Sequence, residues 1–287
     1  MTVQEILTWG KSQQKSVEVS HLRALLGHIM GFPASFLFSH PDHPISLEVE
    51  NIFKNKVQRL CEGVPLSRVV GEREFWSLSF TLNEATLDPR ADSECLIEGV
   101  LNHYRDLRTP LQILDMGTGT GCLLISLLSE YREAQGLGVD KSPRALEAAR
   151  QNAQRILRGS HRAVFCLSNW YEHVVGGFDV IISNPPYLTL QEYETLNPFV
   201  KCYDPKEALV GGEDGLEAYR FLIQGAPAFL KQKGILVLEI GHLQKTAVTN
   251  LLHTHGFCLE EIRKDLSGIE RCLVSSYHGS KSEERVP

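Results

Sequence analysis

The sequence has no pair of cysteines in a C-x-x-C spacing, although it contains seven cysteines. Disulfide frameworks and cysteine-based zinc sites depend on clustered or paired cysteines, so neither is expected to organise this fold. Cysteines scattered along a chain are typical of buried thiols in a reducing compartment. We therefore expect a cytoplasmic protein.

Long apolar runs are also missing. No stretch of about 18 apolar residues is present to cross a bilayer. The first 20 residues have neither the apolar core of a signal peptide nor the Arg-rich character of a transit peptide, so we expect the chain to start near Met1. Residues 278–287 are polar and lack periodicity, which predicts a frayed tail.

The sequence carries no excess of positive charge, because 29 Lys and Arg residues face 35 Asp and Glu residues and give a formal net charge of -6. Strong nonspecific attraction to DNA or to an anionic membrane is therefore not expected. A protein partner or a small molecule fits better, and we expect a monomer that binds neither nucleic acid nor membrane directly.

The spacing of apolar residues changes twice along the 287-residue chain. In residues 1–72 apolar side chains recur at helical spacing between prolines, which predicts a small helical bundle. Residues 73–90 alternate as in EFWSLSFTL, which predicts a β-hairpin linker. In residues 91–287 apolar strands alternate with amphipathic helices, which predicts an α/β domain with a mostly parallel sheet covered on both faces.

The expected helices of this α/β domain lie near 93–104, 121–131, 144–157, 215–231 and 243–255. The expected strands lie near 111–117, 136–140, 163–168, 178–184, 234–240, 258–263 and 271–276.

A glycine-rich segment, ILDMGTGTG, leads from the first of these strands into a helix. Its G-x-G-x-G spacing differs from the G-x-G-x-x-G of dinucleotide sites, so we predict a nucleoside without a pyrophosphate grip. Asp140 ends the next strand, where its carboxylate can accept both hydroxyl hydrogens of a ribose. Asp115 precedes the glycines and can orient the loop or attract a cationic amino group.

A second segment, FDVIISNPPY, ends a strand in a rigid turn at the edge where open α/β sheets place their chemistry. An amide nitrogen is a poor nucleophile, and acceptors for both of its hydrogens activate it. The Asn184 side-chain oxygen and the Pro185 carbonyl can supply these acceptors. Tyr187 can wall a planar substrate group or face a cationic methyl group.

No metal site is predicted. The two close histidine pairs are His40 with His43 and His253 with His255, and neither pair has an apparent third ligand.

The combination of DMGTGTG, GLGVD and SNPPY resembles the HemK/PrmC family of release-factor glutamine methyltransferases, as do GEREFW and DPRADSECLIE between the domains. The likeness spans residues 60–275. It implies a Rossmann-like class I methyltransferase with a seven-stranded sheet, in which 1–72 docks the release factor, 73–90 links and 91–287 catalyses. It further implies methylation of N5 of the glutamine in the Gly-Gly-Gln motif of class I release factors, with S-adenosylmethionine as the methyl donor.

The resemblance also implies roles for individual residues. The positions matched to cofactor binding are Gly117, Thr118, Gly119, Thr120, Gly121, Asp140, Trp170 and Asn184. The positions matched to the substrate amide are Asn184, Pro185, Pro186 and Tyr187, with Asn184, Pro185 and Tyr187 in catalytic roles. The family commonly has Asp where this chain has Asn169, which alters an acceptor for the adenine amino group. It also commonly has Pro where this chain has Ala91.

Two other functions remain open. The same Asn-Pro-Pro-Tyr turn serves N6-adenine methyltransferases acting on DNA or RNA, but the acidic balance and the lack of a basic stretch with interleaved aromatics favour a protein substrate. A noncatalytic S-adenosylmethionine-binding scaffold is the other alternative, and the intact turn argues against it.

Overall fold

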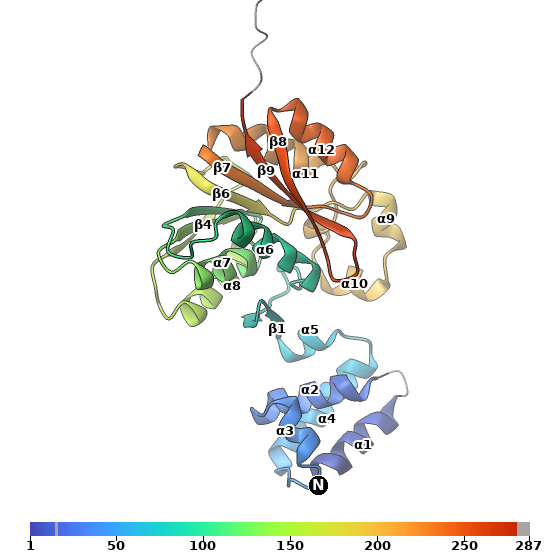
Figure 1. Cartoon of the computed structure of the whole chain (residues 1–287). Coiled ribbons are helices and arrows are strands. Elements are labelled where there is room, and N and C mark those ends of the chain that lie inside the picture. The colour runs from blue at the N-terminus through green and yellow to red at the C-terminus, as the bar shows by residue number, and fades with distance from the viewer. Residues whose placement is uncertain (15–16, 280–287) are drawn as a thin grey trace, which may run out of the picture. The chain divides into compact units, whose positions relative to one another are not determined.

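A computed structural model describes residues 1–14 and 17–279 (Figure 1). The expectation of a frayed tail falls mostly on residues 280–287, which lie outside the described residues. The chain forms two compact units. One contains Met1–Glu72 together with Pro198–Tyr203, and the other contains Arg73–Asn197 and the described residues 204–279. No helix of the described residues is long and apolar enough to span a membrane.

The first unit is helical, and its elements are α1 (Val3–Gln13), α2 (Val19–Met30), α3 (Ala34–Ser39), α4 (Leu47–Cys61), α5 (Leu66–Val70) and α10 (Pro198–Tyr203). A capping box at Thr2 starts α1, and Gly31 ends α2 in the left-handed conformation. The core is formed mainly by apolar residues of α1, α2 and α4, and Tyr203 of α10 packs against it. The unit therefore includes a short helix that lies far away in the sequence.

A two-stranded hairpin is formed by β1 (Glu72–Phe75) and β2 (Leu78–Thr81), within the region expected to be a hairpin. Its turn residues Trp76 and Ser77 have φ of 52° and 56°, as a tight hairpin turn requires. The turn interrupts the strict alternation of the sequence. Phe75 and Phe80 are consequently both buried, with ring centroids 6.3 Å apart.

Within residues 73–279 the main sheet has seven strands in the order β5-β4-β3-β6-β7-β9-β8. The strands are β3 (Gln112–Met116), β4 (Gln135–Asp140), β5 (Ala163–Leu167), β6 (Phe178–Ser183), β7 (Leu230–Glu239), β8 (Phe257–Lys264) and β9 (Glu270–Tyr277). All neighbours pair in parallel except β9, which is antiparallel to β7 and β8. This mostly parallel sheet confirms the expected Rossmann-like class.

Helices cover both faces of the sheet, as Figure 1 shows. One face packs against α6 (Glu94–His103), α7 (Cys122–Glu130) and α8 (Pro143–Ile156), and the other against α11 (Glu217–Gly225) and α12 (Lys245–Thr254). Short 3-10 turns are η1 (Ala91–Ser93), η2 (Lys206–Ala208) and η3 (Ala226–Ala228), and α9 (Leu190–Thr195) follows β6. Each face buries its own apolar cluster, so the sheet forms the centre of a three-layer domain.

The helix expected over 215–231 was too long. Helix α11 ends at Gly225, and Leu230 already belongs to β7. The reason is Pro227, which cannot donate a helical hydrogen bond and sits in the short turn η3.

The order of the strands locates the site. The chain leaves β3 for β4 on one side and reaches β6 on the other, so β3 is the point at which the strand order reverses. Open α/β sheets bind ligands beyond the carboxyl ends of the strands at such a point. The loops after β3, β4 and β6 meet at this edge.

Candidate active site

A cavity of about 680 Å³ lies at the carboxyl edge of the sheet. Segments at the ends of four neighbouring strands line it, namely 117–120, 139–142, 168–170, and Asn184 with Pro186. Its volume is in the range of small-molecule sites, which is about 300–1,000 Å³. The cavity therefore accommodates a ligand of cofactor size beside the turn after β6.

The glycine loop after β3 gives the cavity an open floor. Gly117 and Gly119 have φ of 75° and 54°, a region that favours glycine. A Cβ added at either residue would meet no atom within 4 Å, so both face open space. The backbone amides of Gly117 and Thr118 both donate to the Val139 carbonyl at 2.9 Å, which ties the loop to the end of β4.

Asp140 anchors the loop from the end of β4. Its Oδ2 accepts from the Gly119 amide at 2.9 Å, and its Oδ1 accepts from the Ser142 amide at 2.9 Å. Burial raises the pKa of this carboxyl, opposed by the two backbone hydrogen bonds. A carboxylate has about four acceptor positions, so two remain for ligand hydroxyl groups.

Asp115 lies beneath the loop and is almost completely buried. Its Oδ2 accepts from the Thr118 hydroxyl at 2.6 Å, while Oδ1 meets no donor with hydrogen-bond geometry among residues 1–14 and 17–279. Burial raises the pKa of Asp115 to about 7, and the bond from Thr118 opposes that rise. The loop thus rests on an acid that titrates near neutral pH.

Trp170 closes the cavity after β5. Its backbone has φ of 51°, its carbonyl accepts from the Ser168 hydroxyl at 2.8 Å, and its ring lies nearly parallel to Phe221. Asn169 also lines the cavity, and its side-chain nitrogen donates to Glu172 at 3.0 Å. The Asn169 oxygen is thereby left as an acceptor at the position where the resemblance expects Asp.

The turn after β6 holds Asn184 at the edge of the cavity. The Ser183 hydroxyl donates to the Met116 carbonyl at 2.6 Å and joins this turn to the end of β3. The Asn184 side-chain nitrogen donates to the Ser93 hydroxyl at 3.0 Å, which leaves its oxygen as an acceptor. In the described part of the chain no donor reaches the Pro185 carbonyl.

Most of the expected site residues come together here. The residues that line the cavity are Gly117, Thr118, Gly119, Thr120, Asp140, Trp170, Asn184 and Pro186. Gly121, Pro185 and Tyr187 do not line it. A Cβ at Gly121 would come within 2.8 Å of Ile125, so this glycine permits the start of α7.

Arg90 and Ser93 are among the lining residues to which the sequence analysis assigned no role. Arg90 donates to the buried carboxylate of Asp204 at 2.5 Å. Ser93 lines the cavity and contacts Asn184 directly. The only sequence signal for them was their place in DPRADSECLIE, one of the segments that carry the resemblance.

Comparison with known proteins decides the family. Residues 5–71 match the PrmC N-terminal domain, and residues 87–202 match the methyltransferase small domain. The release factor glutamine methyltransferase of Rhodospirillum rubrum is 40% identical over 253 residues, which cover 88% of this chain and 77% of the relative. That of Agrobacterium fabrum is 38% identical over 255 residues and covers 88% of both chains.

The chain belongs to the release factor glutamine methyltransferase family. A methyltransferase structure from Pyrococcus furiosus, 18% identical with a TM-score of 0.51 over 77% of this chain and 98% of that chain, shares the fold. The protein is an enzyme with S-adenosylmethionine as its cofactor.

The residues present fit this cofactor. The open floor at Gly117 and Gly119 leaves room for its amino-acid part, and Asp140 retains acceptor positions for the ribose hydroxyls. Trp170 offers an aromatic surface, and Asn169 offers an amide oxygen to the adenine. The acid beneath the loop favours a cationic ligand over a pyrophosphate.

We predict that the Kd for S-adenosylmethionine falls as the pH rises through about 7. Asp115 is mostly neutral below its pKa of about 7, and the cationic cofactor favours the ionised form. Binding then releases a proton, so the Kd should fall by at most about tenfold per pH unit below that pKa. Calorimetry in buffers of different ionisation enthalpy measures both the Kd and the number of protons released on binding. Asp115→Asn is the matched control with a pH-independent Kd, whereas a flat wild-type profile would contradict the prediction.

Proposed function

We propose that this enzyme transfers a methyl group from S-adenosylmethionine to N5 of the glutamine in the Gly-Gly-Gln motif of class I peptide-chain release factors. The observation that carries the proposal is the pair of acceptors on Asn184 and Pro185, placed beside a cofactor-sized cavity. Relatives that cover most of the chain carry the name release factor glutamine methyltransferase, which supports a glutamine amide as the substrate group.

The chemistry requires activation of a weak nucleophile. When bound, the cofactor supplies an electrophilic methyl group on its sulfonium. The Asn184 oxygen and the Pro185 carbonyl accept the two amide hydrogens and stabilise positive charge as it develops on nitrogen. Both acceptors are fixed before the substrate arrives, which orients the nitrogen for in-line attack. The proton becomes acidic after transfer, so no strong base is required beforehand.

Tyr187 acts through its ring and its backbone. Burial raises the pKa of its hydroxyl to about 12, so this group stays protonated and does not serve as a base near neutral pH. Its carbonyl accepts from the Gln244 side chain at 2.9 Å, which fixes the residue behind the turn. The ring then forms a wall for the planar amide group.

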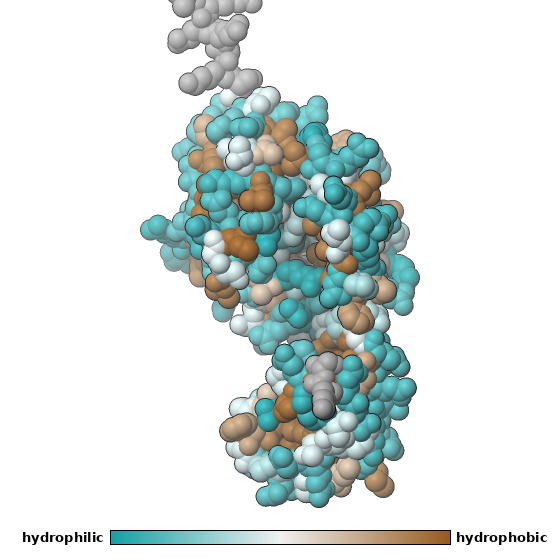
Figure 2. Space-filling view, turned by 90° about the vertical axis from the view of Figure 1, so that its right-hand side faces the viewer, coloured by the Kyte–Doolittle hydropathy of each residue, from teal (hydrophilic) through white to brown (hydrophobic). Residues whose placement is uncertain are grey.

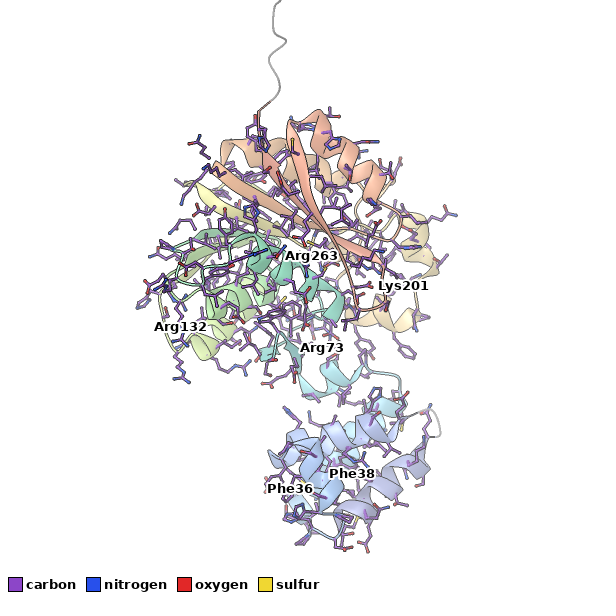
Figure 3. All side chains as sticks on the ribbon, viewed as in Figure 1. Phe36, Phe38, Arg73, Arg132, Lys201 and Arg263 are labelled. Carbon is purple, nitrogen blue, oxygen red and sulfur yellow. The ribbon has the colours of Figure 1, made fainter. Side chains whose placement is uncertain are left out.

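The helical unit is the proposed docking module for the release factor. Aromatic side chains gather around α3, where Phe32 and Phe36 stack at 4.3 Å and the Arg23 guanidinium lies 5.4 Å from the ring of Phe38. Figure 3 shows Phe36 and Phe38 on this helix, and Figure 2 shows hydrophobic residues at the surface of the unit. Phe38 is 73% exposed. Aromatic and Arg side chains are enriched in protein interfaces relative to the rest of the surface.

Replacing Phe38 by Ala should therefore raise the KM for an intact release factor by about tenfold, while the Kd for S-adenosylmethionine stays unchanged. Val175→Ser is the matched control. Val175 is also exposed, but it lies just before β6, at the edge of the sheet opposite the carboxyl ends of the parallel strands. Steady-state kinetics on the intact factor and on a short Gly-Gly-Gln peptide separate docking from chemistry. An unchanged KM for the intact factor would argue against docking through α3.

The proposal extends to the setting of the enzyme. We propose a cytoplasmic monomer whose partner is a class I release factor and which binds neither nucleic acid nor membrane directly. The formal net charge of -6 supports a protein substrate over an adenine in DNA or RNA. Incubation with labelled cofactor and either a purified release factor or an RNA and DNA mixture tests the choice. Label in the release factor alone is expected, and label in nucleic acid would revive the N6-adenine alternative.

A further inference from the structure

A buried carboxyl group lies behind Asn184 and takes no part in the chemistry described above. Glu239 ends β7 and is only 2% exposed. Its Oε2 accepts a hydrogen bond from the Ser93 hydroxyl at 2.5 Å, and the Ser93 oxygen accepts from the Asn184 side-chain nitrogen at 3.0 Å. A continuous chain of hydrogen bonds therefore runs from Glu239 through Ser93 to Asn184.

The fold explains why these three residues meet. Strands β6 and β7 pair with Ile182 opposite Val237 and Ser183 opposite Leu238, so Asn184 and Glu239 follow at the ends of neighbouring strands. Ile182 and Val237 both face the helices α6 and α7. Alternation along a strand places the side chains two residues later on the same face.

Ser93 comes from a different part of the chain and is the residue immediately before α6. Serine in this position commonly accepts a hydrogen bond from the first turn of its helix. Here its side chain makes no capping bond, and its hydroxyl is used between Glu239 and Asn184 instead. The Ser93 hydroxyl therefore links Glu239 to Asn184 and does not cap α6.

The chain of bonds has a fixed direction. An ionised carboxylate can only accept, so the single hydroxyl proton of Ser93 must point to Glu239. The Ser93 oxygen can then only accept from Asn184, which must turn its nitrogen toward Ser93 and its oxygen away. A flipped amide would set two oxygen atoms against each other and present a donor to the substrate.

We propose that Ser93 and Glu239 are positioning residues that hold the Asn184 amide in the one orientation that offers an acceptor to the substrate nitrogen. The inference rests on the proposed function, because it assigns a role to the same amide-binding turn. Neither residue touches the substrate in this account. Their effect is exerted entirely through Asn184.

The protonation of Glu239 links this orientation to pH. Burial raises the pKa of Glu239 to about 7, while the Ser93 hydrogen bond and the charges of Arg271 and Arg90 oppose the rise and Asp92 adds to it. The charge of Glu239 in turn adds to the rise that burial causes in the pKa of the neighbouring side chains Tyr187, Tyr219, Cys122 and Cys272, which are therefore uncharged near neutral pH. A protonated Glu239 can donate to Ser93 and release the hydroxyl proton toward Asn184. The orienting effect is therefore lost as the pH falls through about 7.

The test uses full-length Ser93→Ala, Ser93→Thr and Glu239→Gln with a purified class I release factor. Single-turnover methylation, the KM for the factor and the Kd for S-adenosylmethionine are measured from about pH 6 to about pH 8. Ser93→Ala should lower the methylation rate by about tenfold, with KM and Kd within about twofold of wild type. Ser93→Thr keeps the hydroxyl and should restore most of the rate. Glu239→Gln should remove the fall in rate that wild type shows toward acid pH.

A double-mutant cycle with Asn184→Ala completes the experiment. Adding Ser93→Ala to Asn184→Ala should cause no further loss, since residues that act through one group are not additive. Wild-type rates and pH profiles in all Ser93 and Glu239 variants would overturn the inference. If Ser93→Ala fails to fold, as thermal melting would show, Ser93→Thr and Glu239→Gln decide by the pH profile. Absence of methylation by the wild type would instead contradict the proposed function itself.

Discussion

Asn184→Ala should lower the rate of glutamine methylation by about 10² to 10³, because one of two fixed acceptors for the amide hydrogens is removed. The Kd for S-adenosylmethionine should change by no more than a few-fold, since the glycine loop and Asp140 remain in place. Single-turnover kinetics with a release factor, measured beside calorimetry of cofactor binding, gives both values. The separation between rate and affinity is the signature of a residue that acts on the substrate.

Asn184→Asp is the finer comparison. Its carboxylate keeps an acceptor and adds a negative charge beside the cationic cofactor, so cofactor affinity should equal or exceed that of wild type. The introduced carboxylate can only accept hydrogen bonds. The Ser93 oxygen, which accepts from the Asn184 side-chain nitrogen in the wild type, therefore loses its donor in this variant. The variant should therefore lose its fixed orientation and methylate slowly. A near-normal rate in Asn184→Ala would contradict amide activation and leave only the cofactor site standing.

Asp140→Ala should weaken the binding of S-adenosylmethionine by about 10² to 10⁴. Hydrogen bonds to a charged acceptor contribute about 1.5 to 3 kcal/mol each, and two ribose contacts are lost together. The variant also leaves the Gly119 and Ser142 amides without their carboxylate partner, which loosens the loop. Calorimetry measures the effect directly.

Asp140→Asn serves as the control for Asp140→Ala, because it keeps the shape and one acceptor oxygen. Its Kd should fall between those of wild type and Asp140→Ala. An unchanged Kd in Asp140→Ala would place the ribose elsewhere in the cavity. Thermal melting of the cofactor-free variants distinguishes a lost contact from a lost fold.

The parts of the site that local pattern determines could be predicted from the sequence. The glycines of DMGTGTG must follow a strand and precede a helix, and the structure places Gly117 and Gly119 in the left-handed conformation at the cavity floor. Asp140 ends β4, the strand beside β3, and therefore lies next to these glycines. These features depend on neighbours in the chain, so alternation and turn residues are sufficient to find them.

Features that depend on distant residues were missed. Ser93 and Glu239 lie 146 positions apart, and only the pairing of β6 with β7 places Asn184 and Glu239 at neighbouring strand ends, where Ser93 joins them. Once the strand order is known, side-chain alternation along β6 and β7 predicts that Asn184 and Glu239 lie on the same face of the sheet. The sequence alone does not give that strand order. The end of α11 at Gly225 was missed for a local reason, since Pro227 lay inside an otherwise helical apolar pattern.

The helical unit shows a further limit of sequence reasoning. Helix α10 lies inside the chain of the catalytic domain, yet it belongs to the helical unit, with Tyr203 against its core and the ring of Phe199 beside Gly63. Its six residues carry no periodic signal long enough to reveal a partner. The very next residue, Asp204, returns to the catalytic domain and pairs with Arg90.

The central claim is that the amide nitrogen of one glutamine receives the methyl group. The direct measurement is tandem mass spectrometry of a class I release factor after reaction with the wild-type enzyme and isotopically labelled S-adenosylmethionine. The account predicts a single labelled methyl group on N5 of the glutamine in the Gly-Gly-Gln motif, and its loss with Asn184→Ala. Label on any other residue, or undiminished label with Asn184→Ala, would contradict it.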